Sequence, residues 1–395
     1  PKTGKMEEYY NYAIGREGEP GSVFKASTIM TLLEDGYIHS LEETIPTNHG
    51  KEGTLPLDQH IYDYERQYGT NEITILKGLE MSSNYVFAHL AVSNYSKHPK
   101  DFIDKLYMYK LGEAFDFDLA GMATPSVPSP DKDSWSITSL GTTAYGYSVT
   151  ETPLHILTFY NAIANKGKMM KPYLVEDIEK NGVVKETLGP SILNASICSR
   201  ATADTITRGL TAVVQSGTAT RLRNTKFKVA GKTGTARIVL DEQDSKIAAG
   251  RYNDEWGRKK NQATFVGFFP AEQPKYSFIV VIYSILSGES FYGGTLPALA
   301  ARDIVDGIWS MDPVWMETLE PKASVPPMPA TEMLAQVQDS PTVPDLSGLG
   351  LRDALYAVEN SGMKCEYTGT GHVASQSPKA GTAATKGGTV KITLK

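Results

Sequence analysis

A serine and a lysine three residues apart, Ser22 and Lys25, form a pair that could carry nucleophilic chemistry. On a helix, positions i and i+3 lie on one face, so the two side chains would meet. A serine hydroxyl becomes a good nucleophile only when a base removes its proton, and a lysine can be that base only when it is uncharged. Burial or a neighbouring cation favours the uncharged amine. The pair therefore predicts an activated serine with a second positive group beside it.

The position of Ser22 along the chain suits this chemistry. The apolar spacing predicts a helix over residues 22–35, and Gly36 stands where a glycine commonly follows the last turn. Ser22 then lies in the first turn, where free amide N–H groups and the positive end of the helix dipole stabilise a developing oxyanion. The same spacing also describes an N-cap serine followed by a solvated lysine, so the pair alone does not separate the two interpretations.

A second polar cluster, Ser82-Ser83-Asn84, precedes a predicted buried helix over residues 84–92. Serine and asparagine cap helices routinely, which gives this cluster a purely structural interpretation. The functional interpretation has Ser82 relaying a proton and Asn84 orienting a substrate amide. Taken by itself, the cluster leaves both interpretations open.

The third cluster is Lys232-Thr233-Gly234-Thr235, which we expect on a strand. It offers a cation, hydroxyl groups and a backbone position without a side chain, which a ligand can approach closely. These features suit a substrate carboxylate that lies along a strand edge, although a turn or a bulge would also explain the glycine. Lys232 would be the second positive group that Lys25 requires.

Two further matches to these patterns are expected to be structural. Ser129 and Lys132 have the Ser-x-x-Lys spacing, but prolines before and within the pair prevent the helix that would align them. Lys2-Thr3-Gly4 precedes the first cluster and lies at a terminus that we expect to fray.

The elements that must position these clusters follow from periodicity and residue type. Helical spacing of apolar residues, or a helix-like composition, marks residues 22–35, 84–92, 152–166, 200–214 and 295–310. Runs of β-branched and aromatic residues predict strands at Phe227–Ala230, Ala263–Phe269 and Tyr276–Tyr283. Asn181-Gly182 predicts a hairpin turn. We therefore expect a mixed α/β (α+β) body with an antiparallel sheet.

Composition divides the chain into three parts. Residues 1–311 form the predicted large domain. Residues 312–341 hold several prolines with little periodicity, which predicts a linker. Residues 342–395 are expected to form a small unit with one amphipathic helix near residues 351–358 and a final strand at Val390–Leu394.

The bulk properties exclude several classes of function. A net charge of −6 argues against nucleic acid as a partner. The two cysteines, Cys198 and Cys365, lie in different predicted domains and are expected to be unpaired. The histidines lack paired ligand spacing and no Gly-rich phosphate loop occurs, so we expect neither a metal nor another cofactor. No apolar run reaches about 18 residues, and because the chain begins at Pro1 we expect a membrane helix upstream in a longer protein.

From Glu19 onward the chain resembles the class B penicillin-binding proteins, and its last part resembles a PASTA domain. The order of the three clusters is much more specific than any one of them and carries the first resemblance. Weaker agreements lie at residues 146–150, 162–165 and 292–294, and the PASTA markers are residues 343–346, 375–378 and the last strand. The resemblance implies a serine β-lactamase/penicillin-binding-protein-like transpeptidase fold, with a central antiparallel sheet flanked by helices, plus a small α/β PASTA domain.

The resemblance also implies an activity. It points to a peptidoglycan D,D-transpeptidase that serves cell-wall synthesis in division and is acylated and inhibited by β-lactams. The implied partners are stem peptides that end in D-Ala-D-Ala, β-lactam antibiotics and divisome proteins. The implied location is extracytoplasmic, with the full-length protein anchored in the membrane.

The resemblance further implies that Ser22 would attack the penultimate D-alanine carbonyl of a stem peptide, with Lys25 as the base that deprotonates it. Ser82 and Lys232 would pass a proton to the leaving amine. An amine from a neighbouring stem would then resolve the acyl-enzyme.

The third cluster would bind the other end of the substrate. Thr233 and Thr235, on either side of Gly234, would hold the terminal carboxylate. The backbone N–H groups of Ser22 and Thr235 would form the oxyanion hole, in which loss of one donor costs roughly 3–4 kcal/mol.

Two features depart from the family. Only about twenty residues precede Ser22, where the family has a membrane helix and a pedestal domain, and this stretch could contribute a strand to the sheet. The segment Asp241–Asn261 is long and rich in charged residues, and we expect it to form a solvated β-hairpin loop close to the cleft.

Two other functions fit parts of the pattern. A serine β-lactamase would share the acylation step, but a class A enzyme needs a carboxylate in a Glu-x-x-Leu-Asn pattern, and Leu193-Asn194 has Pro190 at that place. A non-catalytic cell-wall-binding or sensing protein would use the same fold, but it need not keep the serine and both lysines. A Ser-His-Asp triad is a weaker interpretation, because Gly-x-Ser-x-Gly is absent.

Overall fold

The computed structural model describes residues 10–47, 71–238, 260–286, 292–311 and 342–395. The chain divides into two compact units, residues 1–316 and 317–395. Residues 2–4, residues 312–341 and most of the predicted loop Asp241–Asn261 lie outside the described residues. Cys198 and Cys365 are both free thiols, as predicted. No helix in the described ranges combines the length and the apolar character needed to cross a membrane.

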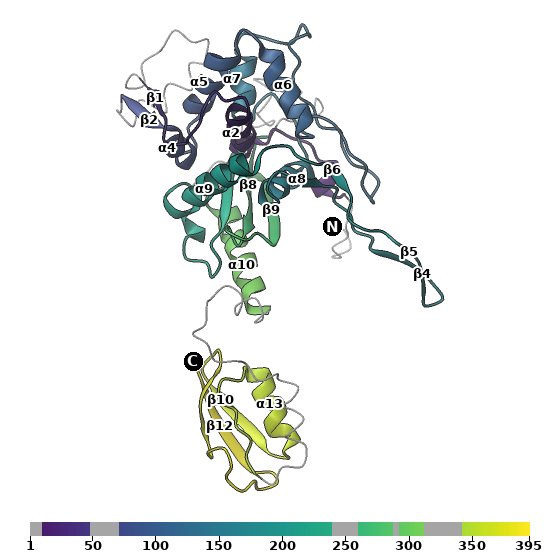
Figure 1. Cartoon of the computed structure of the whole chain (residues 1–395), viewed down its shortest axis with the longest axis vertical. Coiled ribbons are helices and arrows are strands. Elements are labelled where there is room, and N and C mark those ends of the chain that lie inside the picture. The colour runs from purple at the N-terminus through teal and green to yellow at the C-terminus, as the bar shows by residue number, and fades with distance from the viewer. Residues whose placement is uncertain (1–9, 48–70, 239–259, 287–291, 312–341) are drawn as a thin grey trace. The chain divides into compact units, whose positions relative to one another are not determined.

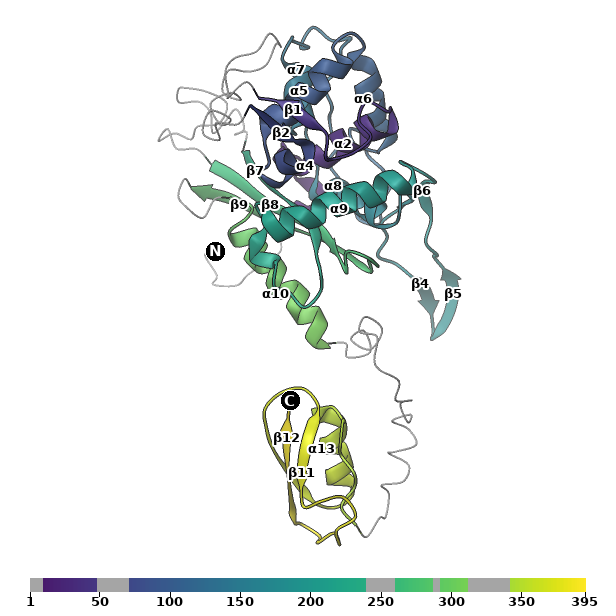
Figure 2. The same ribbon diagram turned by 60° about the vertical axis from the view of Figure 1, so that its left-hand side comes forward.

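One lobe of the first unit is mainly helical, and both ribbon views show its helices gathered beside the sheet (Figures 1 and 2). Helix α2 is the buried centre of this lobe: Ile29, Met30 and Leu32 have no exposed surface. The elements of the lobe are α2 (Lys25–Glu34), β1 (Thr44–Pro46), β2 (Glu72–Thr74), α4 (Ile75–Glu80), α5 (Asn84–Tyr95), α6 (Pro99–Met108) and α7 (Ser139–Ala144). Apolar burial around α2 fixes the residues at its start in the interior.

The other lobe contains a three-stranded antiparallel sheet in the order β7-β8-β9. Strand β7 pairs with β8 without a register shift from Ala230, opposite Phe268, to Arg237, opposite Asn261. The strands are β7 (Ala230–Arg237), β8 (Lys260–Phe269) and β9 (Tyr276–Leu286), and the helices against them are α8 (Pro153–Ala164), α9 (Arg200–Ser216) and α10 (Leu296–Met311). The predicted α/β (α+β) class, with an antiparallel central sheet flanked by helices, is confirmed for the described residues.

Strand β7 begins later than the sequence suggested. The prediction of a strand at Phe227–Ala230 is wrong for its first three residues, because β7 starts at Ala230 and carries the Lys-Thr-Gly cluster itself. Phe227 packs against Phe269 and Trp309 instead. A short apolar run buried beside a sheet has the same composition as a strand, which explains the error.

The segment before Ser22 also differs from expectation. Within residues 10–21 the structure has a short helix, α1 (Tyr12–Gly15), and one β-bridge between Gly18 and Glu151. The prediction that this stretch could contribute a strand to the sheet is therefore wrong for these residues. The Asn11 side chain accepts the N–H of Ala13 and caps α1, which favours a helix over a strand. The predicted helix over 22–35 starts with a 3₁₀ turn, η1 (Gly21–Phe24), before α2.

A β-arm follows α8. Strand β3 (Met169–Met170) pairs with β6 (Ile192–Asn194), and β4 (Asp177–Lys180) pairs antiparallel with β5 (Val183–Thr187). Asn181 and Gly182 form the turn with φ values of 56° and 74°. A two-residue type I′ turn requires positive φ at both positions, so the predicted hairpin is confirmed.

The second unit has its own hydrophobic core, which includes Leu346 and Val358. Its central strand, β12, is parallel to β10 and antiparallel to β11. The elements are α13 (Leu351–Asn360), β10 (Lys364–Thr368), β11 (Val373–Ser377) and β12 (Thr389–Leu394). Exposed and buried residues alternate along β12, which confirms the predicted helix and alternating strand of this unit.

A carboxyl group is buried behind the segment that leads to Ser22. The backbone of Glu151 exchanges hydrogen bonds of 3.0 and 2.9 Å with Gly18. Its two carboxyl oxygens are buried and form no close hydrogen bond among the described residues, although the backbone N–H of Gly112 approaches the carboxyl group and partly offsets its burial. Burial raises the pKa of Glu151 well above its usual value of 4.5, and the charge of Glu17 acts in the same direction. The folded protein therefore favours the protonated side chain.

Glu151→Gln is expected to stabilise the protein at neutral pH. Because the folded pKa is raised, the wild-type side chain supports folding fully only below the unfolded pKa near 4.5, and this stability is lost as the pH rises through the folded pKa. A neutral amide of the same shape avoids the loss. Within that window, the difference in the free energy of unfolding between the variant and the wild type should increase by about 1.4 kcal/mol per pH unit, in favour of the variant.

Denaturant titrations of both proteins across the window measure this difference. Burial also lowers the pKa of His155 to about 4, and this effect is present in both proteins. Glu179→Gln, at an exposed position on β4, is the matched control and should leave the pH dependence unchanged. Parallel pH curves for wild type and Glu151→Gln would contradict a protonated, buried Glu151.

Candidate active site

The amine of Lys25 lies at the centre of a compact polar cluster. Its Nζ donates to Ser22 Oγ at 2.9 Å and to Asn84 Oδ1 at 2.8 Å. It also contacts the Ser82 carbonyl oxygen at 2.6 Å and Ser82 Oγ at 3.2 Å. Lys25 has no exposed surface. Four acceptors thus surround a group with at most three N–H bonds, and two of the predicted clusters meet at one atom.

Lys232 joins the cluster from strand β7. Its Nζ donates to Ser82 Oγ at 2.8 Å and to the Thr233 carbonyl oxygen at 3.0 Å, and it too has no exposed surface. Burial lowers the pKa of Lys232 to about 7. Ser82 Oγ therefore lies between the amines of Lys25 and Lys232, where it can relay a proton from one to the other.

The start of α5 shows why two side chains of the second cluster can enter the site. Ser83 is the N-cap, and its Oγ accepts the N–H of Val86 at 3.2 Å. Ser82 has a φ of 61°, in the left-handed region that few non-glycine residues adopt. The capping interpretation therefore holds for Ser83, while Ser82 and Asn84 are directed to Lys25.

Ser22 lies in η1, which packs closely against strand β7. A Cβ atom on Gly234 would lie 2.9 Å from Val23 Cγ1, and a Cβ atom on Gly21 would lie 2.9 Å from the Thr235 carbonyl oxygen. Both glycines thus permit the close approach of turn and strand. Gly234 lines the pocket, and its missing side chain makes room for the turn that carries Ser22.

Gly146 supports the same turn. Its carbonyl oxygen accepts the N–H of Gly21 at 2.9 Å. Its φ is 88°, and a Cβ atom there would lie 2.0 Å from the Gly21 carbonyl oxygen and 2.8 Å from Phe24 Cβ. No side chain fits at this position unless η1 moves.

Gly146→Ala is expected to destabilise the protein by about 3 kcal/mol or more, because a positive φ and a clash with backbone act together. Gly121 is the matched control: its φ is 89°, but a Cβ atom there would meet nothing within 4 Å. Gly121→Ala should cost only the backbone strain, about 1–2 kcal/mol. Denaturant unfolding of both variants gives the two values, and equal losses would show that the contact with η1 carries no energy.

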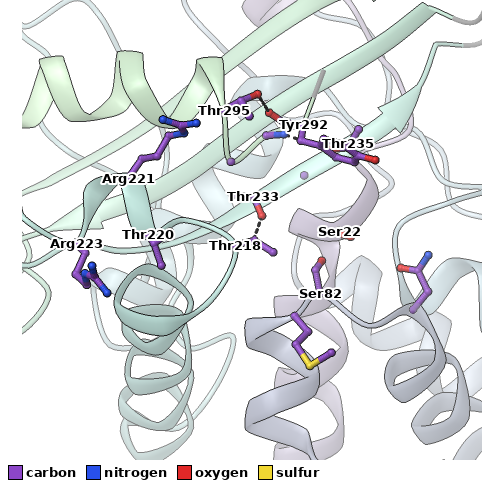
Figure 3. A pocket seen from close by; sticks show the side chains of 15 residues that line it. Ser22, Ser82, Thr218, Thr220, Arg221, Arg223, Thr233, Thr235, Tyr292 and Thr295 are labelled. Carbon is purple, nitrogen blue, oxygen red and sulfur yellow. Dashed lines mark hydrogen bonds between the residues drawn. The ribbon is translucent and has the colours of Figure 1, made fainter. Parts of the chain in front are cut away.

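A pocket of about 680 Å³ opens over Ser22 (Figure 3). Strand β7 forms one side of it, with Thr233 and Thr235. The Thr233 hydroxyl is 2.6 Å from the hydroxyl of Thr218, and Thr235 Oγ1 accepts the N–H of Gly293 at 3.1 Å. The pocket thus combines a serine next to a buried amine with a row of hydroxyl groups on the strand beside it.

The structure adds pocket residues that sequence reasoning did not find. Residues 292–294 line the pocket, and in the sequence they showed only a weak agreement with the family. The other lining residues outside the three clusters are Met81, Thr218, Thr220, Arg221, Arg223 and Thr295. Several of them follow Gly217, at which α9 ends. A hydroxyl-rich and glycine-containing segment between a helix and the Lys-Thr-Gly strand was the signal that could have found them.

This arrangement can perform acyl transfer. A buried amine at hydrogen-bond distance from a hydroxyl can take its proton, and the hydroxyls of Thr233 and Thr235 can hold an anionic group of a ligand. Within the described ranges, no three His, Cys, Asp or Glu side chains gather in a way that could hold a metal ion.

Comparison with protein families gives two matches that together cover most of the chain. The model described as the penicillin binding protein transpeptidase domain matches residues 1–306. The model of the PASTA domain matches residues 341–395.

Individual proteins agree with these matches. Penicillin-binding protein H of Bacillus subtilis is 31% identical over 310 residues, which cover 72% of this chain and 40% of that protein. Peptidoglycan D,D-transpeptidase FtsI of Escherichia coli is 26% identical over 305 residues, which cover 76% of this chain and 45% of FtsI. The chain therefore spans about half the length, or less, of these relatives. The D,D-transpeptidase domain of a peptidoglycan glycosyltransferase from Eggerthella lenta shares the fold, with a TM-score of 0.59 and 24% identity over 76% of this chain and 68% of that chain.

Proposed function

Because the chain belongs to the penicillin-binding-protein transpeptidase family, we propose that it is a serine D,D-transpeptidase that cross-links peptidoglycan stem peptides. Its fold is that of the penicillin-binding-protein transpeptidase domains, followed by a PASTA domain. FtsI bears the name of a peptidoglycan D,D-transpeptidase, which supports both the reaction and the substrate. The role that we propose for each residue rests on the contacts of the side chains around Ser22.

The observation that carries the proposal is the position of the Lys25 amine. It is fully buried and within 2.9 Å of Ser22 Oγ, so it can serve as the base that a serine nucleophile requires. The amine of Lys232 approaches the same cluster through Ser82. Burial of the Lys25 amine favours its uncharged form, and Lys232 favours it further whenever Lys232 is protonated.

In acylation, uncharged Lys25 takes the proton of Ser22, and Ser22 Oγ bonds to the carbonyl carbon of the penultimate D-alanine. The oxyanion is held by the backbone N–H groups of Ser22 and Thr235, a role supported by the close packing of η1 on β7. When the intermediate collapses, the C–N bond breaks. Ser82 and Lys232 pass the proton that Lys25 had taken on to the nitrogen, so Lys25 is uncharged again and free D-alanine departs.

In the second half of the reaction, the amine of a neighbouring stem attacks the acyl-Ser22 ester. Lys25 removes the proton of the attacking amine, the C–O bond breaks, and Ser22 regains its proton. The hydroxyls of Thr233 and Thr235 hold the terminal carboxylate of the first substrate, and Asn84 orients its amide. A β-lactam undergoes the same attack at its ring carbonyl, and the ring C–N bond breaks. The nitrogen stays attached to the acyl group through the rest of the molecule and cannot depart, so the acyl-enzyme persists.

A product assay tests this function against its two alternatives. The protein is incubated with a stem-like peptide that ends in D-Ala-D-Ala and with an amine acceptor. We expect equal amounts of released D-alanine and of the new amide. Continuous hydrolysis of the chromogenic β-lactam nitrocefin would instead identify a β-lactamase, and binding of cell-wall peptides without any acyl transfer would identify a binding protein.

The setting of the whole protein forms part of the same proposal. A peptidoglycan substrate requires an extracytoplasmic site, and we propose a membrane anchor outside the present chain and a role in division together with divisome proteins. For the PASTA domain we propose either recognition of cell-wall fragments or a structural role. Labelling of intact cells with an impermeant fluorescent β-lactam tests the location.

A further inference from the structure

The pocket over Ser22 extends well past the groups that the reaction needs. Beyond the hydroxyl pair of Thr218 and Thr233 it is lined by Thr220, Arg221 and Arg223. Figure 3 shows the two arginines on the far side of this pair from Ser22. This end of the pocket has no part in the steps described above.

The charge at this end is positive and unbalanced. Among the described residues, neither Arg221 nor Arg223 forms an ion pair or a side-chain hydrogen bond, and no residue that lines the pocket is acidic. The chain as a whole carries a net charge of −6, so a cationic pocket rim is a local feature and not a consequence of overall composition. Two guanidinium groups that lack an acidic partner and line a ligand pocket attract carboxylates.

The segment that carries the arginines is held in place. Leu222, between them, is buried, and the turn around it is closed by backbone hydrogen bonds from Leu222 to Ala219 and from Arg223 to Thr220. The N–H of Thr218 donates to the carbonyl oxygen of Glu80 at 3.1 Å and ties the segment to the helical lobe. The two guanidinium groups therefore project from a fixed backbone, which limits the entropy lost when a ligand binds.

The direction of the substrate follows from the proposed function, on which this inference rests. The scissile carbonyl lies at Ser22, and the terminal carboxylate lies at Thr233 and Thr235. The arginines are therefore on the carboxylate side of the substrate. We propose that Arg221 and Arg223 determine specificity for a free C-terminal carboxylate, which they attract toward the threonine hydroxyls, over an amidated end.

A matched pair of substrates separates this charge effect from all others. Both are N-acyl-D-alanyl thioesters, one with a thioglycolate leaving group that carries a free carboxylate and one with the corresponding thioglycolamide. The double variant R221Q/R223Q is compared with R200Q/R208Q, which removes two exposed arginines of α9 that do not line the pocket. The quantity measured is the ratio of kcat/KM for the carboxylate to kcat/KM for the amide.

At low ionic strength, R221Q/R223Q should lower this ratio by about 5- to 20-fold, and the drop should shrink to less than about 3-fold at high salt, because exposed charges are screened. R200Q/R208Q should leave the ratio at the wild-type value. An unchanged ratio in R221Q/R223Q, an equal loss for both thioesters, or an equal drop in the control would overturn the inference. A wild-type protein that acylates neither thioester would instead refute the proposed function.

Discussion

Replacement of Ser22 by alanine is expected to abolish covalent labelling by a fluorescent penicillin. The variant keeps both lysines, Ser82 and the pocket, but it lacks Ser22 Oγ, the atom that forms the ester in the proposed reaction. Removal of a serine nucleophile costs on the order of 10⁶-fold in kcat in a comparable hydrolase, so labelling should fall below detection. The measurement is in-gel fluorescence after incubation with a large excess of the penicillin.

Ser27→Ala is the matched control for this prediction. Ser27 is a buried serine of α2, the helix that follows η1, and its Oγ donates to the Phe24 carbonyl oxygen at 2.7 Å, away from the pocket. This variant should label as the wild type does. Labelling that survives in Ser22→Ala would assign the nucleophile to another residue and remove the basis of the proposed mechanism.

Lys25→Arg should collapse acylation although the positive charge is kept. Arginine cannot be deprotonated in proteins, so it cannot take the proton of Ser22. General base catalysis contributes about 10²–10⁴-fold, and a loss of at least this size is expected in the rate constant for β-lactam acylation. Stopped-flow measurement with benzylpenicillin gives the rate constant directly.

The control for Lys25→Arg is the same substitution at a lysine that only forms an ion pair. Lys105 is partly buried and lies 2.5 Å from Asp35, outside the pocket. Lys105→Arg should acylate normally. Wild-type acylation by a well-folded Lys25→Arg protein would exclude Lys25 as the base, whereas a lower melting temperature in that variant alone would not account for a 10²-fold loss.

The buried amine of Lys232 carries a cost in stability. Burial lowers the pKa of Lys232 to about 7 from its usual value of 10.5. A group with a lowered folded pKa supports folding only above its unfolded pKa, and this support is lost as the pH falls toward the folded value. Lys232 therefore opposes folding at neutral pH, which is consistent with the catalytic role that we propose for it.

The local sequence predicted well which side chains come together, because each cluster is short and lies within one or two turns of chain. Ser22 and Lys25 are neighbours on one turn, so their contact needed only a helical segment. The sequence could not predict that Ser83 takes the capping role and leaves Ser82 and Asn84 to the lysine. That division depends on the left-handed φ of Ser82, which tertiary contacts impose.

The rest of the pocket depended on tertiary packing. Arg221 and Arg223 belong to no motif, and they line the pocket because Leu222 is buried between them. Gly146 showed only a weak agreement in the sequence, yet the distance from its position to the Gly21 carbonyl makes it essential for the η1 turn. Contacts between segments more than a hundred residues apart leave no periodic signal in the chain.

Mass spectrometry of the wild-type protein after reaction with benzylpenicillin tests the central claim most directly. We expect one adduct with the mass of one intact benzylpenicillin, located on the peptide that contains Ser22 and persistent over the time of the digestion. An adduct on any other peptide, or an unmodified protein with hydrolysed penicillin in solution, would contradict a stable acyl-enzyme at Ser22.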